Sequence, residues 1–138
     1  MPDNSAIGEA IFESWEKRDY DAIVEKMADD VVVNSPGSAE LKGKAAAKDW
    51  YASWAIACPD GVAGAKCVGA TKDTAVMEGI YAGTNTGTFG SFPPTGRTVS
   101  LPWTNVYRFN STGKIVNVNA YLDLVTLLTQ LGHMEPLT

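Results

Sequence analysis

The sequence has very few of the residues that build metal centres and disulfide frameworks. It contains one histidine, His133, and two cysteines, Cys58 and Cys67, which flank a Pro-Asp-Gly turn. No Cys-x-x-Cys pair is present, whereas structural zinc sites draw about four ligands from cysteine and histidine. The two cysteines are therefore expected to be free thiols, and we expect no metal site.

Positive charge and long apolar runs are also scarce. Lysine and arginine together number 11 against 16 acidic residues, which gives a formal net charge of -5 and a pI near 4.7. Because nucleic-acid binding depends on clustered basic residues, no nucleic-acid partner is expected. No segment approaches the length of a membrane span, and the N-terminus lacks the apolar stretch of an export signal. The expected setting is the cytoplasm, with no membrane partner.

The overall composition is that of a globular protein. Hydrophobic residues make up 45% of the chain and charged residues 20%, a balance that argues against disorder. A chain of 138 residues is long enough to bury a core without disulfides or metals. We therefore expect a single domain that spans residues 1–138.

The first half of the chain shows the spacing of amphipathic helices. A first helix is predicted from Ser5 to about Lys17. A shorter one, which includes Met27, begins at Asp19 or Asp21 and is ended by Asp29-Asp30. A valine-rich strand follows at 31–34. A third helix is predicted from Lys44 to about Ala57, with two tryptophans on one stripe.

The second half reads as strands separated by polar turns. Strands are predicted at 62–68, 74–81, 99–109 and 115–121, with hairpin turns at 72–73 and 111–113. Helices followed by a run of strands indicate an α+β fold. We predict a curved antiparallel sheet wrapped around the N-terminal helices, forming a cone with one open end.

The alternation of side chains predicts which strand faces line that cone. In the strand 99–109 the odd positions are the likelier interior because they are mostly apolar; they are Val99, Leu101, Trp103, Asn105, Tyr107 and Phe109. In the strand 115–121 the odd positions include Asn117 and Asn119, and the even ones are apolar. The sequence leaves open which face of this last strand is interior.

Asp123 is the leading candidate for chemistry. It stands where strand periodicity ends and a short apolar helix begins, at the mouth of the predicted cone. One interpretation is a helix N-cap, since aspartate is a preferred residue there. The other is a general acid/base, which requires burial to raise the pKa of the carboxyl group. One side chain could serve both purposes.

Several polar and aromatic residues are candidates for contacts with a ligand. The amides of Asn105 and Asn119 can orient a carbonyl group or a water, or can simply satisfy the backbone. Glu78 lies in an otherwise apolar strand and is expected to pair with Arg108 or to act as a second acid/base. Aromatic residues are abundant for so small a domain, and some should line a cavity for a flat ligand.

The segment from Gly83 to Phe109, GTNTGTFGSFPPTGRTVSLPWTNVYRF, is followed by Gly-Lys-Ile-Val at 113–116, by Asp123 and by Gln-Leu-Gly at 130–132. This succession resembles the SnoaL-like polyketide cyclase, or ester cyclase, branch of the nuclear-transport-factor-two-like superfamily. The helix with Trp15 and the segment LKGKAAAKDWY also fit, so the resemblance covers nearly the whole chain. It implies the cystatin-like α+β barrel of that superfamily, with a ligand pocket inside a cone of helices and curved sheet.

The resemblance also implies a function. In that family the matching aspartate is proposed as the general acid/base for intramolecular aldol closure of a polyketide ester, a role that would fall to Asp123. No cofactor is implied. The family commonly has histidine at the position aligned with Asn85, and Glu-His-Trp where this chain has Asn-Val-Asn at 117–119.

We therefore expect a cofactor-free acid/base enzyme of the cyclase type acting on a small, mostly apolar molecule. Its expected catalytic residues are Asp123, Asn105, Asn119 and Asn85. The expected substrate-binding residues are Phe12, Trp15, Trp50, Trp54, Trp103, Tyr121, Phe89 and Glu78. The alternatives are a non-catalytic binding protein of the same fold, and epoxide hydrolase, dehydratase or isomerase activity. A homodimer through the outer sheet face is also expected.

Overall fold

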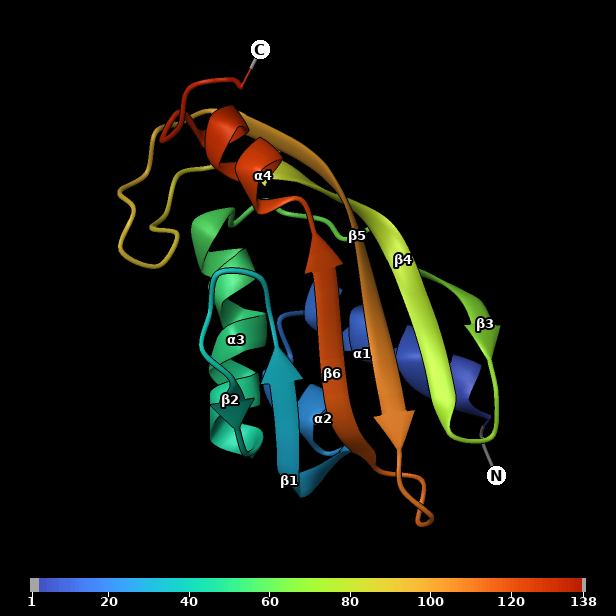
Figure 1. Cartoon of the computed structure of the whole chain (residues 1–138). Helices are drawn as coiled ribbons and strands as arrows, with labels where there is room; N and C mark the ends of the chain where they lie inside the picture. Colours follow the sequence, from blue (N-terminus) through green and yellow to red (C-terminus); the bar gives the residue numbers. More distant parts are fainter. Residues whose placement is uncertain (1–2, 138) are drawn as a thin grey trace.

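The computed structural model describes residues 3–137 and consists of one curved sheet with helices on its concave side (Figure 1). The strands are ordered β2-β1-β6-β5-β4-β3 across the sheet. In chain order the elements are α1 (Asn4–Glu16), α2 (Tyr20–Val24), β1 (Met27–Asn34), β2 (Leu41–Lys42), α3 (Lys44–Ala57), β3 (Lys66–Ala70), β4 (Thr74–Thr84), β5 (Thr98–Phe109), β6 (Ile115–Leu122) and α4 (Leu124–Leu131).

The predicted α+β class is confirmed, but the sheet is mixed rather than fully antiparallel. β1 runs parallel to β6, while the other neighbouring strands are antiparallel. Turn residues between consecutive strands predict hairpins only. They carry no information on how β1 meets a strand from the other end of the chain. The sheet is not closed, because β2 and β3 form its two edges.

The second helix is shorter than predicted. α2 ends at Val24, and Met27 opens β1 instead of continuing the helix. Met27 lies opposite Ile115 in the parallel pairing, and the Ile115 amide donates to the Lys26 carbonyl oxygen at 3.0 Å. Tertiary pairing with β6 therefore overrides the local apolar spacing that favoured a helix.

β5 forms the central wall of the core, and its predicted inner face is confirmed. The six odd positions from Val99 to Phe109 are all buried. On the opposite side Ser100, Pro102 and Arg108 are exposed. This alternation directs Trp103, Asn105 and Tyr107 towards the helices.

β6 changes its inner face at a bulge, which explains why its pattern is ambiguous. Arg108 pairs with Asn117 but Phe109 pairs with Ile115, so Val116 is an extra residue on β6. Ile115 is therefore buried before the bulge, and Val118 and Ala120 are buried after it. From this point the even positions face the core and the asparagines face outward.

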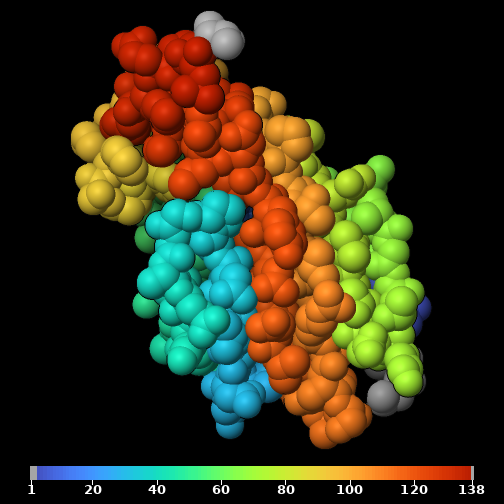
Figure 2. Space-filling view, viewed as in Figure 1, coloured from blue at the N-terminus to red at the C-terminus, as the bar shows by residue number. Residues whose placement is uncertain are grey.

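α4 covers one end of the sheet (Figure 1). Its last turn ends at Gly132, whose φ of 86° is a left-handed conformation that favours glycine. The Gln130 side-chain oxygen accepts from the Ser100 amide, and its nitrogen donates to the Ser100 carbonyl oxygen, both at 2.9 Å. The two bonds attach α4 to the backbone of β5. The outer sheet face is left broad and uncovered by helices α1 to α3 (Figure 2).

The described helices are all too short or too polar to cross a membrane.

Candidate functional site: an aromatic pocket

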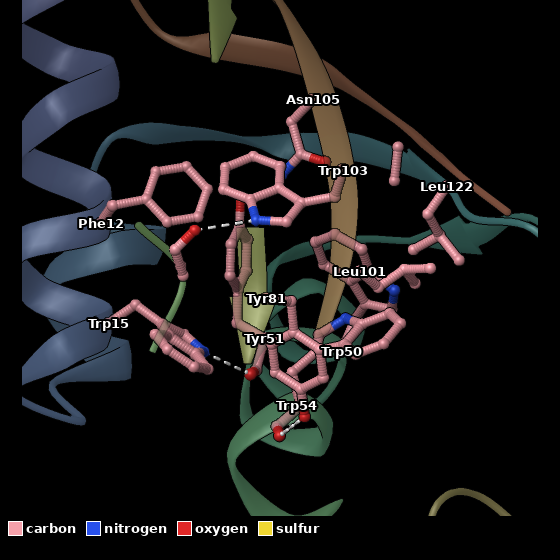
Figure 3. A pocket seen from close by; sticks show the side chains of 12 residues that line it. Phe12, Trp15, Trp50, Tyr51, Trp54, Tyr81, Leu101, Trp103, Asn105 and Leu122 are labelled. Atoms are coloured by element: carbon pink, nitrogen blue, oxygen red, sulfur yellow. Dashed lines mark hydrogen bonds between the residues drawn. The ribbon is translucent and has the colours of Figure 1, made fainter. Parts of the chain in front are cut away.

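The inner sheet face, α1 and α3 enclose a pocket with about 500 Å³ of space free of protein atoms, its open mouth included. Aromatic side chains dominate its walls (Figure 3). The lining residues are Phe12, Trp15, Trp50, Tyr51, Trp54, Ala63, Tyr81, Leu101, Trp103, Asn105, Ala120 and Leu122. Aromatic walls of this kind suit a flat, mostly apolar ligand.

The aromatic walls hold one another in fixed orientations. Phe12 stacks on Trp103 with ring centroids 4.7 Å apart. Trp50 and Trp54, four residues apart on α3, stand nearly perpendicular at 6.2 Å. Tyr81 meets Trp54 edge-on at 5.4 Å. Stacked and edge-to-face contacts of this kind stabilise aromatic pairs beyond the burial of area, so the walls are largely preformed.

Several polar atoms of the wall residues are occupied by backbone acceptors. The Trp15 indole donates to the Tyr51 carbonyl oxygen at 2.9 Å, and the Trp103 indole donates to the Ala63 carbonyl oxygen at 3.0 Å. The Tyr81 hydroxyl donates to the Trp54 carbonyl oxygen at 2.6 Å. These bonds fix the wall, and the three donated hydrogens are not available to a ligand.

Asn105 is the one amide side chain that lines the pocket. It is only 5% exposed, and it lies at one end of the group of rings (Figure 3). Within residues 3–137, its side chain makes no hydrogen bond of regular geometry, although a weak contact links it to the Tyr107 hydroxyl. An amide carries both donors and an acceptor, so Asn105 keeps bonding capacity that a ligand can use.

A pair of tyrosine hydroxyls lies behind Asn105. The Tyr51 and Tyr107 hydroxyl oxygens are 2.6 Å apart, and the two residues are 2% and 0% exposed. Burial raises the pKa of Tyr51 well above its ordinary value, and the Tyr107 pair partner acts in the same direction. Burial raises the pKa of Tyr107 to about 12, against the opposing effect of its contacts with Tyr51 and Asn105. Both tyrosines are therefore neutral donors at physiological pH.

The lining contains no aspartate, glutamate, lysine, arginine or histidine. Burial of an unpaired charge inside such walls would be strongly unfavourable. The pocket is therefore suited to an uncharged, mostly apolar ligand that offers one polar group to Asn105.

Asp123 lies outside the lining, directly after Leu122, and its carboxylate is exposed. It is the N-cap of α4, as one of the two sequence interpretations predicts: it accepts from the Thr126 amide at 3.0 Å and from the Thr126 hydroxyl. Hydrogen bonds from the Thr126 hydroxyl and amide lower the pKa of Asp123 below its ordinary value. This is the opposite of the raised pKa expected of a desolvated acid, and the catalytic role of Asp123 stays a prediction.

Asn85 also lies outside the lining, in a buried structural position. Its side-chain nitrogen donates to the carbonyl oxygens of Ala57 and Gly87 at 3.0 and 2.9 Å, and its oxygen accepts from the Thr95 amide at 2.9 Å. These bonds tie the segment 85–97, here called the flap, to the end of α3. With its amide fully engaged, Asn85 has no group left to meet a substrate.

Three further predicted residues lie on the outer face of the sheet instead of in the pocket. The Asn119 side chain accepts from Asn34 at 2.9 Å, and Tyr121 is exposed. The bulge at Val116 turns both outward. Glu78 pairs in register with Lys66 and Thr104.

The expected pair between Glu78 and Arg108 is not formed among the described residues. Arg108 bonds the Thr74 hydroxyl instead at 3.1 Å, because Thr74 is its direct partner across β4 and β5.

Phe89 contributes to the pocket indirectly. It is part of the flap, where its backbone pairs with that of Phe92 around a tight turn. Its ring packs on Trp54 at 5.6 Å, on the far side of a residue that lines the pocket. The pocket lining brings together five of the predicted binding residues and the predicted catalytic residue Asn105. The five binding residues are Phe12, Trp15, Trp50, Trp54 and Trp103.

Tyr51 lines the pocket although no sequence pattern marks it as a site residue. The inward face predicted for β5 includes Tyr107, but no local pattern links it to a hydroxyl that lies 56 positions away in sequence. The other missed lining residues are Tyr81, which is buried on β4, and four small or aliphatic residues that have no chemical signature: Ala63, Leu101, Ala120 and Leu122.

Solved structures with the same fold span nearly the whole chain. A candidate SnoaL-like polyketide cyclase from Jannaschia sp. CCS1 is 18% identical with a TM-score of 0.83, covering 94% of this chain and 91% of its own. IdmH, a candidate polyketide cyclase from Streptomyces antibioticus, is 26% identical with a TM-score of 0.74, covering 93% and 97%.

A third relative shows the fold with a small molecule bound. A protein of ketosteroid isomerase-like fold from Catenulispora acidiphila, in complex with trimethylamine, is 20% identical with a TM-score of 0.72, covering 91% of this chain and 92% of its own. Among proteins with curated descriptions, none matches this sequence.

The family model for the SnoaL-like polyketide cyclases matches residues 6–131, which include every residue that lines the pocket. The family and the fold together support a small-molecule enzyme of the cyclase or isomerase type. The chain belongs to the SnoaL-like polyketide cyclase family.

Proposed function

We propose that the aromatic pocket binds a flat, uncharged, mostly apolar molecule that carries carbonyl groups, and that this molecule is the substrate of a cofactor-free ring closure or isomerisation. The observation that carries the proposal is an almost wholly apolar pocket with a single buried amide, Asn105, free to bond a ligand. Aromatic walls bind flat rings, and one amide fixes the orientation of a carbonyl oxygen.

The proposed ring closure proceeds through an enolate intermediate. A methylene group between two carbonyls loses a proton to the Asp123 carboxylate, and the electron pair moves onto a carbonyl oxygen near Asn105. The resulting carbanion attacks a second carbonyl carbon of the same molecule, and the new alkoxide takes the proton back from Asp123. The lowered pKa of Asp123 makes it a weak base, which suits only such doubly activated methylenes. To act, its carboxylate must leave the hydrogen bonds of Thr126.

The second candidate function is binding without turnover. It is favoured by the absence of carboxylate and imidazole groups from the lining, and by the capping role of Asp123. The relative with bound trimethylamine is an example of this fold holding a small molecule.

We also propose a homodimer formed through the outer sheet face. This face carries the exposed side chains of Ile80 and Tyr121. It also carries Glu78, Lys66 and Arg108, which have no ion-pair partner among the described residues. A two-fold axis would bring unlike charges of two copies together over an apolar centre.

Hydrogen–deuterium exchange at an activated methylene tests the enzymatic proposal. The substrate is ethyl 3-(2-naphthyl)-3-oxopropanoate in D₂O, followed by proton NMR. The wild type should accelerate loss of the methylene signal, and Asp123→Asn should abolish the acceleration. Asp19→Asn is the matched control, because Asp19 is also an exposed N-cap, bonded to the Ala22 amide at 3.2 Å.

The outcomes separate the two candidates. Binding of the ester without faster exchange in the wild type would support the binding protein. Equal exchange in the wild type and Asp123→Asn would refute the role of Asp123. If the ester neither binds nor exchanges, the pocket proposal itself is wrong.

A further inference from the structure

The structure assigns a further role to Tyr51 and Tyr107: with Asn105 they form a hydrogen-bond-donating end of the pocket that recognises an acceptor oxygen. This inference rests on the proposed function only in that the pocket must bind a flat ligand. It names the chemical class of that ligand: an uncharged molecule with an acceptor oxygen, such as a ketone, quinone or ester, rather than a carboxylate.

The three groups form one cluster built from two elements. Tyr51 comes from α3, and its ring lines the pocket. Tyr107 follows Asn105 by two positions on the same inner face of β5. The two hydroxyl oxygens are 2.6 Å apart, a normal length for a hydrogen bond between hydroxyls. No other side chain of the described residues bonds either hydroxyl with regular geometry.

The cluster contains more hydrogens than its internal contacts use. An asparagine amide carries two N–H hydrogens, and each tyrosine hydroxyl carries one. The bond between the hydroxyls uses one hydrogen, and the contact of Asn105 with Tyr107 uses at most another. Hydrogens are left over whichever way the amide and the hydroxyls are turned. The cluster therefore offers donors to a ligand.

The rest of the lining adds donors and no charge. The indole N–H groups of Trp50 and Trp54 have no acceptor among the described residues. No lysine, arginine or histidine is present to neutralise a carboxylate ligand. A neutral acceptor oxygen fits these conditions, and so does an enolate oxygen that becomes negative only during the reaction.

The three residues have different parts in this recognition. Asn105 lines the pocket and contacts the ligand oxygen directly. Tyr107 does not line the pocket, so it is a positioning residue that orients the Asn105 amide and the Tyr51 hydroxyl. Removal of either hydroxyl should weaken the binding of acceptor ligands and leave apolar binding intact.

Two shape-matched probes test the inference. 2-Acetylnaphthalene carries a carbonyl oxygen, and 2-isopropenylnaphthalene replaces it with a methylene group of similar size. Dissociation constants are measured by quenching of tryptophan fluorescence in the wild type, Tyr51→Phe and Tyr107→Phe. Tyr121→Phe is the control, because it removes an exposed hydroxyl on the outer sheet face. Thermal unfolding checks that each variant is folded.

We expect the wild type to bind the ketone about tenfold more tightly than the alkene. Tyr51→Phe and Tyr107→Phe should lose most of this preference while their affinity for the alkene stays unchanged, and Tyr121→Phe should behave as the wild type. A ketone labelled with carbon-13 at the carbonyl should show a downfield shift on binding to the wild type and a smaller one with Tyr51→Phe.

Two results would overturn this inference and leave the proposed function standing. One is equal affinity of the wild type for both probes. The other is an equal loss of affinity for both probes in Tyr51→Phe and Tyr107→Phe. If neither probe binds the wild type, the pocket does not take flat aromatic molecules, and the proposed function fails together with the inference.

Discussion

The Asp123 carboxylate receives hydrogen bonds from both the backbone amide and the hydroxyl of Thr126, three residues further along the chain. The two bonds hold the carboxylate at the first turn of α4, where the positive end of the helix dipole also favours negative charge. The residue that the family resemblance marks for acid/base chemistry is therefore stabilised as an anion.

Carbon-13 NMR titration of the Asp123 carboxyl should give a pKa below its ordinary value of 3.8, because the Thr126 bonds favour the charged form. Thr126→Val removes the hydroxyl donor and should raise this pKa towards 3.8. Since folding lowers the pKa, the stabilising contribution of the group is present above the unfolded value and is lost as the pH falls through the folded value. A pKa clearly above 3.8 in the wild type would contradict the cap geometry and favour a desolvated acid/base.

Asn85 should contribute more to stability than any exposed asparagine. Asn85→Ala leaves the carbonyls of Ala57 and Gly87 and the amide of Thr95 without their partner. The expected loss is about 2–4 kcal/mol in the free energy of unfolding measured with urea.

Asn119→Ala is the control for that measurement. Asn119 makes its side-chain bond to Asn34 at the exposed face of the sheet, and its loss should cost less than about 1 kcal/mol. Similar losses for the two variants would mean that Asn85 does not anchor the flap.

The outer sheet face should govern self-association. Ile80 lies on this face, on β4 opposite Pro102, and is 48% exposed. Sedimentation equilibrium should give about twice the chain mass for the wild type and the chain mass for Ile80→Glu, because a glutamate at a two-fold contact meets its own copy. Ile56→Glu should stay dimeric, since Ile56 is equally exposed, at 55%, but lies on α3. A monomeric wild type would refute the dimer.

The parts of the fold and site that follow from local patterns could be predicted, and those set by irregularities could not. β5 alternates without interruption, so its inner face and the pocket position of Asn105 are readable from the sequence. β6 contains a bulge at Val116 that shifts its inner face by one residue. Asn119 and Tyr121 were consequently expected near the ligand, although they face outward.

Contacts between segments that are distant in sequence also could not be predicted. Neither the parallel pairing of β1 with β6 nor the contact of Tyr51 with Tyr107 has a signal at short sequence distance. Asn85 illustrates a different problem: an amide in a Gly- and Thr-rich segment is equally consistent with a ligand contact and with a backbone anchor. Only the three-dimensional arrangement distinguishes these roles.

The buried tyrosines should make the protein sensitive to alkaline pH. Folding raises the pKa of Tyr107 to about 12 and that of Tyr51 well above 10, mainly through burial. Above pH 10 the unfolded chain loses these protons while the folded chain keeps them, so the free energy of unfolding should fall as the pH rises.

Urea unfolding at pH 8 to 11 should show this fall in the wild type and a smaller one in Tyr51→Phe and Tyr107→Phe, which have no proton to lose at that position. Absorbance at 295 nm should show the two hydroxyls ionising only as the chain unfolds. Parallel curves for all three proteins would mean that these hydroxyls ionise in the folded state at their ordinary pKa, and hence that water reaches the end of the pocket where Asn105 lies.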